Sequence, residues 1–332
     1  MSEMVRERPG VAGTGMRPRP PVFLVGAPRS GTTLLYKALC LHRDAAWISN
    51  WVRRYPQVHP LSAFNRLAGR FPAQRRAVWF GADSNAYVFG ARRPLAHRLF
   101  PMPVEGEPLF VRCGMPDEVP VMADEMAVIS DNVPGGTAGM SGGTTMRLVA
   151  LRRAFSAVNR YSGGPVLISK RIVNNRRIAE LAEAFPGARF VHLVRDGRAV
   201  AYSLTRVDWW DESLVWWYGD SPRRWREEGG DPWEIAARHW PEELRAVDRG
   251  LAAVSPGDVM QLSYEQFIAE PQSILDEVAR FAGLGADPSW RREINGISFN
   301  HSEGWRTHLD HAVLQRIEDL QQDRLRRHGY VA

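Results

Sequence analysis

The sequence predicts an α/β fold with a central parallel β-sheet flanked by helices. Short apolar segments alternate along the chain with segments whose apolar residues recur at helical spacing. Residues 165–194 show this most clearly, because the strand pattern PVLIS, the helical pattern NNRRIAELAEAF and the strand pattern ARFVHLV lie in succession. Such a β-α-β unit has a right-handed crossover, which makes its two strands parallel. Strands that are apolar throughout further indicate a sheet covered on both faces.

The elements before this unit are less regular. Residues 1–20 are rich in Arg, Pro and Gly and predict a disordered tail, so that residues 21–332 would form a single domain. VFLVG, residues 22–26, predicts a buried strand that leads into a helix over residues 32–41. Residues 51–145 predict a helical cap over the sheet.

Inside this cap, helical patterns occur near residues 61–79 and 116–129. Residues 131–145, DNVPGGTAGMSGGTT, predict a flexible loop, because no apolar strand precedes their SGGTT. After the β-α-β unit, GDVMQLSYE at residues 257–265 predicts another strand, and helices are expected at about residues 271–282 and 308–327.

The composition is that of a globular chain, with 44% hydrophobic and 24% charged residues among 332. No run approaches the roughly 20 apolar residues of a membrane span, and the N-terminus lacks the apolar core of a secretory signal. Two unpatterned cysteines, Cys40 and Cys113, predict neither a disulfide framework nor a zinc site. We therefore expect a soluble cytoplasmic protein without membrane contact. The net charge of +6 would attract polyanions, but the arginine runs are short and scattered, which argues against a specific nucleic-acid partner.

Lysine is rare in this chain. Two of the 43 basic residues are lysines, Lys37 and Lys170. A lysine in so arginine-rich a chain can do what arginine cannot, because its compact ammonium can give up a proton. For Lys37, which lies on the first predicted helix, chance is the simpler explanation.

The stretch PVFLVGAPRSGTTLL, residues 21–35, resembles a phosphate-binding loop without its lysine. Gly26 and Gly31 have the spacing of G-x-x-x-x-G-K-[ST], but Thr32 occupies the lysine position and a cation, Arg29, lies inside the loop. A strand, such a loop and a helix N-terminus together direct N–H groups and a positive dipole end to one place. A simple tight turn has the same spacing and is the alternative.

A second basic group is in FVHLVRDGRAVAYSL, residues 190–204. Arg195 follows a predicted strand, and Ser203 lies in the next helix. Ligands of open α/β sheets bind at such strand ends, and an arginine with a hydroxyl can hold a phosphate monoester. The alternative is that Arg195 pairs with Asp196 or with a neighbouring helix. Since two strands end in SKR and VRD, where an ATPase needs an acidic metal ligand, we expect a metal-free site for an anion such as a sulfuryl group.

APRSGTTLL together with RDGRAVAYS resembles the sulfotransferases that use 3′-phosphoadenosine-5′-phosphosulfate, in particular the PRSGTT branch with tyrosylprotein sulfotransferases and many bacterial enzymes. LISKRIVNNRRIAELAEAFPGARFVHLVRD is similar to the K-x-P…FP-x-A-x-F…VRD segment of that branch, and the resemblance extends to VMQLSYEQFIAEPQSILDEVARFAGL. It covers residues 22–41 and 165–332 well and residues 42–164 poorly. It implies a phosphate-loop sulfotransferase fold and sulfuryl transfer to a hydroxyl or amine of a small-molecule or carbohydrate acceptor.

The resemblance also implies roles for individual residues. Arg195 and Ser203 would hold the 3′-phosphate of the donor, and Lys170 matches the family lysine near the transferred group. Trp305 and Arg306, in GWRTHL, match loosely a loop that closes over the donor, and a surface turn fits them nearly as well. The residues that would wrap the 5′-phosphosulfate are Arg29, Ser30, Gly31, Thr32 and Thr33, of which Arg29 would share in catalysis with the lysine.

The catalytic base departs from the family pattern. Where related enzymes often have a glutamate, about twenty residues after the loop, this sequence reads ISNWV. The candidates in the cap are Glu105, Glu107, His59 and Asp83, and each also fits a solvated surface residue. We rank Glu105 first, because its apolar, Pro-bounded loop would bury the carboxylate and strengthen it as a base, and His59 second.

Two further questions stay open at the level of sequence. Seven of the twelve tryptophans lie within residues 209–240, where they suit either an acceptor pocket or packing against the sheet. The function itself has two alternatives from other classes. One is a nucleotide kinase with a phosphate loop, and the other is a basic protein that binds polyanions without chemistry.

Overall fold

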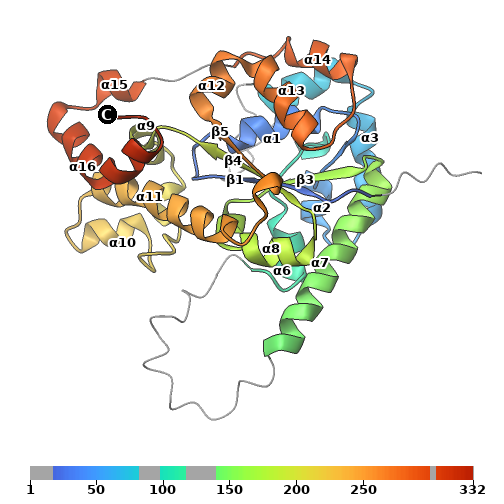
Figure 1. The fold of residues 1–332 in the computed structure, drawn as a ribbon, viewed down its shortest axis with the longest axis horizontal. Helices are drawn as coiled ribbons and strands as arrows, with labels where there is room; N and C mark the ends of the chain where they lie inside the picture. The colour runs from blue at the N-terminus through green and yellow to red at the C-terminus, as the bar shows by residue number, and fades with distance from the viewer. Residues whose placement is uncertain (1–17, 82–97, 117–139, 300–303, 332) are drawn as a thin grey trace, which may run out of the picture.

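A computed structural model describes residues 18–81, 98–116, 140–299 and 304–331. In this part of the chain, five parallel strands form one sheet in the order β2-β3-β1-β4-β5 (Figure 1). The strands are β1 (Val22–Val25), β2 (Ala45–Ala46), β3 (Val166–Lys170), β4 (Arg189–Val194) and β5 (Val259–Ser263). The predicted α/β class with a central parallel sheet is confirmed.

The central strand β1 is buried on both faces, as its uninterrupted apolar sequence predicts. Val22 and Leu24 pack into one core cluster, whereas Phe23 and Val25 pack into a second cluster on the opposite face. In the register of the sheet, Leu24 is opposite Lys170 of β3. The end of β3 therefore lies level with the start of the loop that follows β1.

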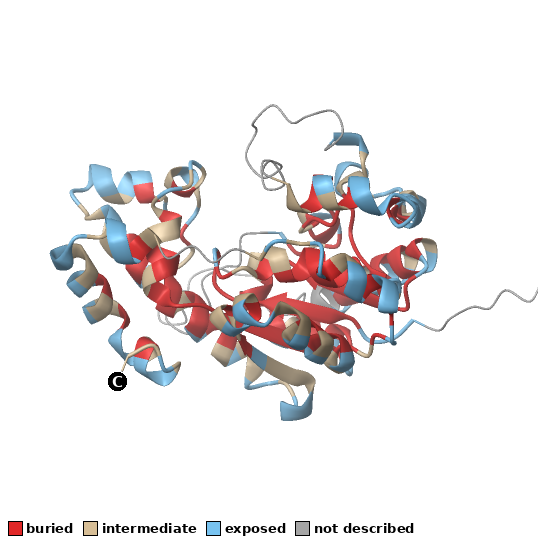
Figure 2. Cartoon of the chain, turned by 90° about the horizontal axis from the view of Figure 1, so that it is seen from above, coloured by how far each residue is buried: buried red, intermediate tan, exposed pale blue. Residues whose placement is uncertain are grey.

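Helices cover both faces of the sheet (Figure 1). Figure 2 shows that buried residues are concentrated in the sheet and in the helix surfaces that pack on it. Residues on the first face come from α1 (Thr32–Cys40), α3 (Asn65–Ala68), α4 (Pro72–Phe80), α12 (Tyr264–Ala269), α13 (Pro271–Phe281) and α14 (Pro288–Ile294). Those on the second face come from α2 (Asn50–Arg54), α6 (Glu107–Arg112), α7 (Met140–Ser162) and α8 (Ile178–Ala184).

A third core cluster begins at the carboxyl end of β4 and includes Val194. It joins α9 (Gly197–Leu204), α11 (Pro232–Leu251) and α16 (His311–Arg327), with α10 (Pro222–Glu227) and α15 (Gly304–His308) beside them. Six of the seven tryptophans of residues 209–240 belong here. Trp210 and Trp240 are buried in this cluster, and Trp209, Trp217, Trp225 and Trp233 pack against it. These six side chains pack in this helical cluster, and a role of the segment in an acceptor pocket stays a prediction.

Several expected elements differ from those observed. Residues 140–145 are not a loop, because α7 begins at Met140. The apolar residues further along α7 pack into the second cluster, and a helix fixed in this way extends cheaply, since each added residue gains a hydrogen bond. The helical pattern at 61–79 is split into a 3₁₀ turn (His59–Phe64), α3 and α4. The short strand β2 was not expected, and residues 117–139 lie outside the described residues.

None of the described helices is long and apolar enough to cross a membrane.

Candidate functional site

The site lies at the carboxyl edge of the sheet, between β1 and β4. The connection after β1 leads through α1 to β2 at one edge, whereas the connection after β4 leads towards β5 at the other edge. The two connections therefore diverge, and such a switch point is where open α/β sheets bind their ligands.

The loop between β1 and α1 is held close to its neighbours by two glycines. A Cβ on Gly26 would lie 2.4 Å from the carbonyl oxygen of Leu193 in β4. A Cβ on Gly31, whose φ is 87°, would lie 2.5 Å from Cδ2 of Tyr264. Arg29 has a φ of 68°, the one positive value among the described non-glycine residues. A left-handed arginine costs about 1–3 kcal/mol, so this turn is maintained by its surroundings.

The Arg29 side chain joins the loop to the segment after β4. Its Nε donates a hydrogen bond to Ser203 Oγ of α9 at 2.9 Å. Arg195, the first residue after β4, donates from Nη1 to the carbonyl oxygen of Arg29 at 2.8 Å. The Arg195 guanidinium carbon also lies 4.3 Å from the ring centroid of Tyr264. The structure thus brings together three of the residues predicted to bind an anion.

The cluster of Arg29, Arg195 and Ser203 is electropositive, and some of the hydrogen-bond donors in and around it lack an acceptor. Burial lowers the pKa of Arg29, and the neighbouring charge of Arg195 acts in the same direction. The two guanidinium groups repel each other, and a bound anion would reduce this repulsion. Among the described residues, neither Ser30 Oγ nor Arg195 Nε has a hydrogen-bond partner, although both atoms are buried. Oxygens of a bound anion would satisfy such donors.

Asp196 does not pair with Arg195, which was the alternative open at the sequence level. Its carboxylate caps α9 and accepts hydrogen bonds from Arg198, including one from Nη2 at 2.8 Å. Arg198 also forms an ion pair with Glu318 of α16, in which Nη1 lies 2.6 Å from Oε1. Because the carboxylate of Asp196 is paired with Arg198, the guanidinium of Arg195 is directed to the loop instead.

Lys170 ends β3 and lies beside Glu105. The lysine is buried, and its Nζ donates a hydrogen bond to Glu105 Oε1. The other carboxylate oxygen of Glu105 accepts from the N–H of Ile172 at 3.3 Å. The side chain of Glu105 is 35% exposed. The predicted lysine and the first-ranked base are therefore neighbours, but Glu105 is ion-paired at the surface of the site rather than surrounded by apolar groups.

Glu107, two residues after Glu105, forms a second ion pair with Arg171, the residue after Lys170. Its carboxylate accepts two hydrogen bonds from Arg171, one of them from Nη2 at 2.6 Å. The Arg171 side chain is 1% exposed, and its guanidinium lies 4.6 Å from the ring centroid of Phe110. This contact anchors the segment of residues 103–107 against β3. Of the two acidic candidates in this segment, Glu107 is the structural one.

Lys37 also belongs to this site, which the sequence reasoning missed. It lies on α1 one turn after Thr33, and its side chain is buried. Burial lowers the pKa of Lys37 to about 7, with the positive charge of Lys170 acting in the same direction. Helical side chains lean towards the N-terminus, so this amine is directed to the first turn of α1. Its rarity in the sequence was the available signal, and it was attributed to chance.

Asn175 is a second residue that the sequence reasoning missed. Its side-chain amide accepts from the N–H of Gly26 and donates to the carbonyl oxygen of the same glycine, both at 3.0 Å. The buried carboxylate of Glu243 accepts from Asn175 and, at 2.9 Å, from Arg176. The start of the loop is thereby fixed by a side chain from the segment after β3. In the sequence, NNRR offered no sign of this contact.

Trp305 and Arg306 lie on α15, which packs on α9. The Trp305 side chain is buried, and two guanidinium groups lie close to its ring, with that of Arg198 at 4.7 Å and that of Arg306 at 4.4 Å from the centroid. This stack is adjacent to the helix that carries Ser203. A direct role for either residue at the donor stays a prediction.

The remaining base candidates do not join the site in the described structure. His59 begins the 3₁₀ turn before α3, where burial lowers its pKa and the charge of Arg112 acts in the same direction. No contact between described residues links His59 to Lys170 or to the loop. Asp83 lies outside the described residues.

Comparisons with known proteins agree with this architecture. A family model described as "Sulfotransferase family" matches residues 20–103 and 138–288. Sulfotransferase STF9 from Mycobacterium avium has a similar structure, with a TM-score of 0.54 at 14% identity, covering 92% of this chain and 76% of that one. For sulfotransferase STF1 from Mycobacterium tuberculosis H37Rv the TM-score is 0.50 at 15% identity, with 92% and 77% covered. A search of curated sequences found no match. The structures agree in fold and the family match spans well over half of the sequence, so the chain belongs to the sulfotransferase family.

Proposed function

We propose that this protein transfers a sulfuryl group from 3′-phosphoadenosine-5′-phosphosulfate to a hydroxyl or amine of a small-molecule or carbohydrate acceptor. The observation that carries the proposal is the contact of Arg29 with both Ser203 and Arg195, which makes the loop and the segment after β4 one anion site. The donor has two anionic ends. The loop with Thr32 and Thr33 suits the 5′-phosphosulfate, and Arg195 with Ser203 suits the 3′-phosphate.

Buried donors support the fit to this nucleotide. Ser30 Oγ and Arg195 Nε have no partner among the described residues, and both would gain one from phosphate or sulfate oxygens. Bound anion would also relieve the repulsion between Arg29 and Arg195.

In the proposed reaction, Glu105 is the general base and Lys170 stabilises the charge of the leaving group. Glu105 accepts the proton of the acceptor hydroxyl, whose oxygen forms a bond to sulfur as the bond from sulfur to the 5′-phosphate oxygen breaks. The electron pair stays on that departing oxygen, where Lys170, Arg29 and the loop N–H groups stabilise the charge. Lys170 must exchange its ion pair with Glu105 for the donor, and this exchange frees the carboxylate to act as the base.

Calorimetric titration with 3′-phosphoadenosine-5′-phosphate tests the donor assignment, with ADP as the nucleotide that lacks the 3′-phosphate. We expect strong preference for the 3′-phosphorylated nucleotide. Arg195→Ala should weaken its binding by about 30-fold to 1000-fold, since a charge-assisted contact is lost, and should leave ADP binding little changed. Equal binding of the two nucleotides by the wild type would refute the assignment.

A metal requirement separates this reaction from that of a kinase. Basic groups stand at the ends of β3 and β4, so transfer should continue in excess EDTA. Activity that disappears with EDTA and returns with Mg²⁺, together with ATP turnover, would favour the kinase alternative.

A further inference from the structure

A hollow lined by arginines lies where α2 and α6 begin. Its volume is about 210 Å³. The residues that line it are Asn50, Trp51, Arg53, Arg54, Arg98 and Pro108. Neither the loop nor the Arg195 cluster contributes to it, so it is distinct from the proposed donor site.

The hollow is tied to the segment that carries Glu105. Ser49, just before α2, forms an antiparallel bridge with Pro103, and the N–H of Val104 donates to Ile48 at 3.0 Å. Pro108 follows Glu105 by three residues and forms part of the wall. The hollow therefore lies at the same edge of the sheet as the ion pair of Glu105 and Lys170.

Hydrogen bonds to residues 99–102 hold the side chains of Asn50 and Trp51 in place in the wall of the hollow. Trp51 Nε1 donates to the carbonyl oxygen of Leu99 at 2.9 Å. The side-chain amide of Asn50 donates to the carbonyl oxygen of Phe100 at 3.0 Å and accepts from the N–H of Met102 at 3.2 Å. These contacts fix the indole and amide beside the arginines.

The charge of the hollow is not compensated by the described protein. Arg53, Arg54 and Arg98 are exposed, and no carboxylate among the described residues bonds to any of them. By contrast, Arg75 and Arg171 nearby in the fold are paired with Glu293 and Glu107. Guanidinium groups gathered around one hollow, with free planar donors, form a site suited to an oxyanion.

We propose that this hollow binds an oxyanion on the acceptor, a carboxylate, sulfate or phosphate group, while the acceptor hydroxyl lies at Glu105. The inference rests on the proposed function and deepens it, because it defines the acceptor as an anionic hydroxyl compound. Three positive charges at the edge of the sheet that also carries the base would select for such a compound against a neutral analogue of equal size.

Matched probes test the charge preference. The protein saturated with 3′-phosphoadenosine-5′-phosphate is titrated with 4-hydroxyphenylacetate and with its neutral analogue 4-hydroxyphenylacetamide. We expect the carboxylate to bind at least about tenfold more tightly. Arg54→Gln and the double variant Arg53→Gln/Arg54→Gln should each remove most of this difference without changing the affinity for the amide.

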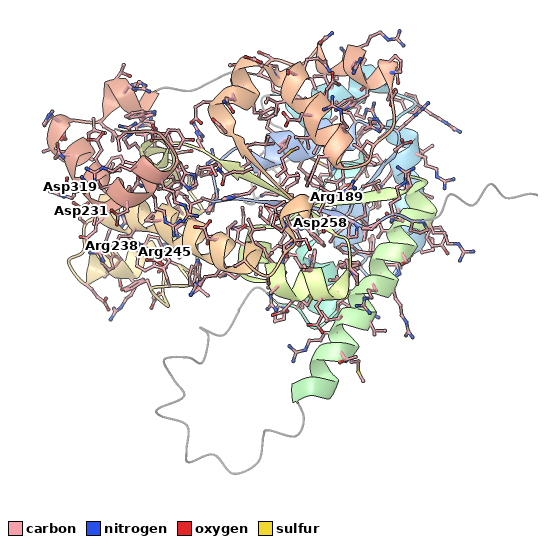
Figure 3. The ribbon with its side chains drawn as sticks, in the orientation of Figure 1. Arg189, Asp231, Arg238, Arg245, Asp258 and Asp319 are labelled. Carbon is pink, nitrogen blue, oxygen red and sulfur yellow. The ribbon has the colours of Figure 1, made fainter. Side chains whose placement is uncertain are left out.

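Arg238→Gln is the matched control, because Arg238 is an exposed arginine on α11, well apart from α2 (Figure 1, Figure 3). This variant should retain the preference for the carboxylate. Equal affinity for the two probes, absence of carboxylate binding, or the same loss in Arg238→Gln would overturn the proposal. Titration of each variant with the nucleotide alone separates the two inferences. Failure of nucleotide binding refutes the donor assignment, whereas the preference for the carboxylate reports on the hollow alone.

Discussion

Replacement of Lys170 gives the sharpest test of the proposed chemistry. The lysine is buried at the end of β3, where its ammonium can follow the charge that moves to the departing oxygen. Loss of one donor to a developing oxyanion costs about 2.7–4 kcal/mol, so Lys170→Ala should lower kcat by about 10²- to 10³-fold. Its effect on nucleotide affinity should be small, because the interaction strengthens mainly in the transition state. Lys170→Arg should recover little activity, since a planar guanidinium cannot take the position of the compact ammonium.

Stability measurements distinguish this role from a structural one. The partner carboxylate of Glu105 is 35% exposed and keeps the N–H of Ile172 as a donor, so Lys170→Ala should destabilise the fold less than the loss of a pair whose two members are buried. Arg171→Met is the matched control, because it breaks the neighbouring pair with Glu107, in which the arginine is 1% exposed. That variant should lose about 3 kcal/mol of stability, and it should lower kcat far less than Lys170→Ala does, because the ammonium of Lys170 stays in place. Full activity of Lys170→Arg would refute the catalytic role and leave the donor site intact.

Three further predictions concern neighbouring residues. Glu105→Gln should lower kcat by about 10²-fold or more with unchanged affinity for 3′-phosphoadenosine-5′-phosphate, and retained turnover would exclude it as the base. Gly31→Ala should weaken nucleotide binding about tenfold or more in calorimetry. The added methyl group would lie 2.5 Å from the Tyr264 ring, on which Arg195 stacks. Wild-type affinity in this variant would contradict this account of the loop. The pKa of Lys37 is about 7 without ligand and should rise beside a bound anion, so affinity should fall at least about tenfold as the pH is raised from about 7.5 to 9.5. Lys37→Met should remove this dependence, and a slope that persists in the variant would assign it to another group.

The fold was predictable wherever a strand is buried on both faces. β1, β3 and β4 are continuous apolar runs, and each lies within about one residue of its expected bounds. β2 has two residues, too few for any periodicity, and it exists because it pairs with β3 across a long stretch of sequence. Residues 140–145 were misread because Gly and Thr favour loops locally, whereas tertiary packing of α7 decides their conformation.

The donor side of the site was predictable because its residues lie at strand ends. Arg29 and Arg195 each follow a strand, and parallel strands bring their carboxyl ends to one edge. The acceptor side gave no such signal. Glu105 reaches Lys170 because residues 103–104 pair with residues 48–49, a contact between segments without regular secondary structure of their own.

The position of Lys37 shows where composition carries information that periodicity does not. On a helical pattern, Lys37 is a polar residue between apolar ones, and nothing marks the face on which it falls. α1 packs on β3, and that contact turns the amine towards the strand that ends in Lys170. The two lysines of the chain therefore come from different elements, 133 positions apart in sequence numbering, to one buried site. Arginine would remain charged there at any accessible pH, whereas a lysine with a pKa of about 7 can be neutral before the donor binds and charged afterwards. This difference gives a physical reason for lysine at position 37 in a chain that otherwise uses arginine.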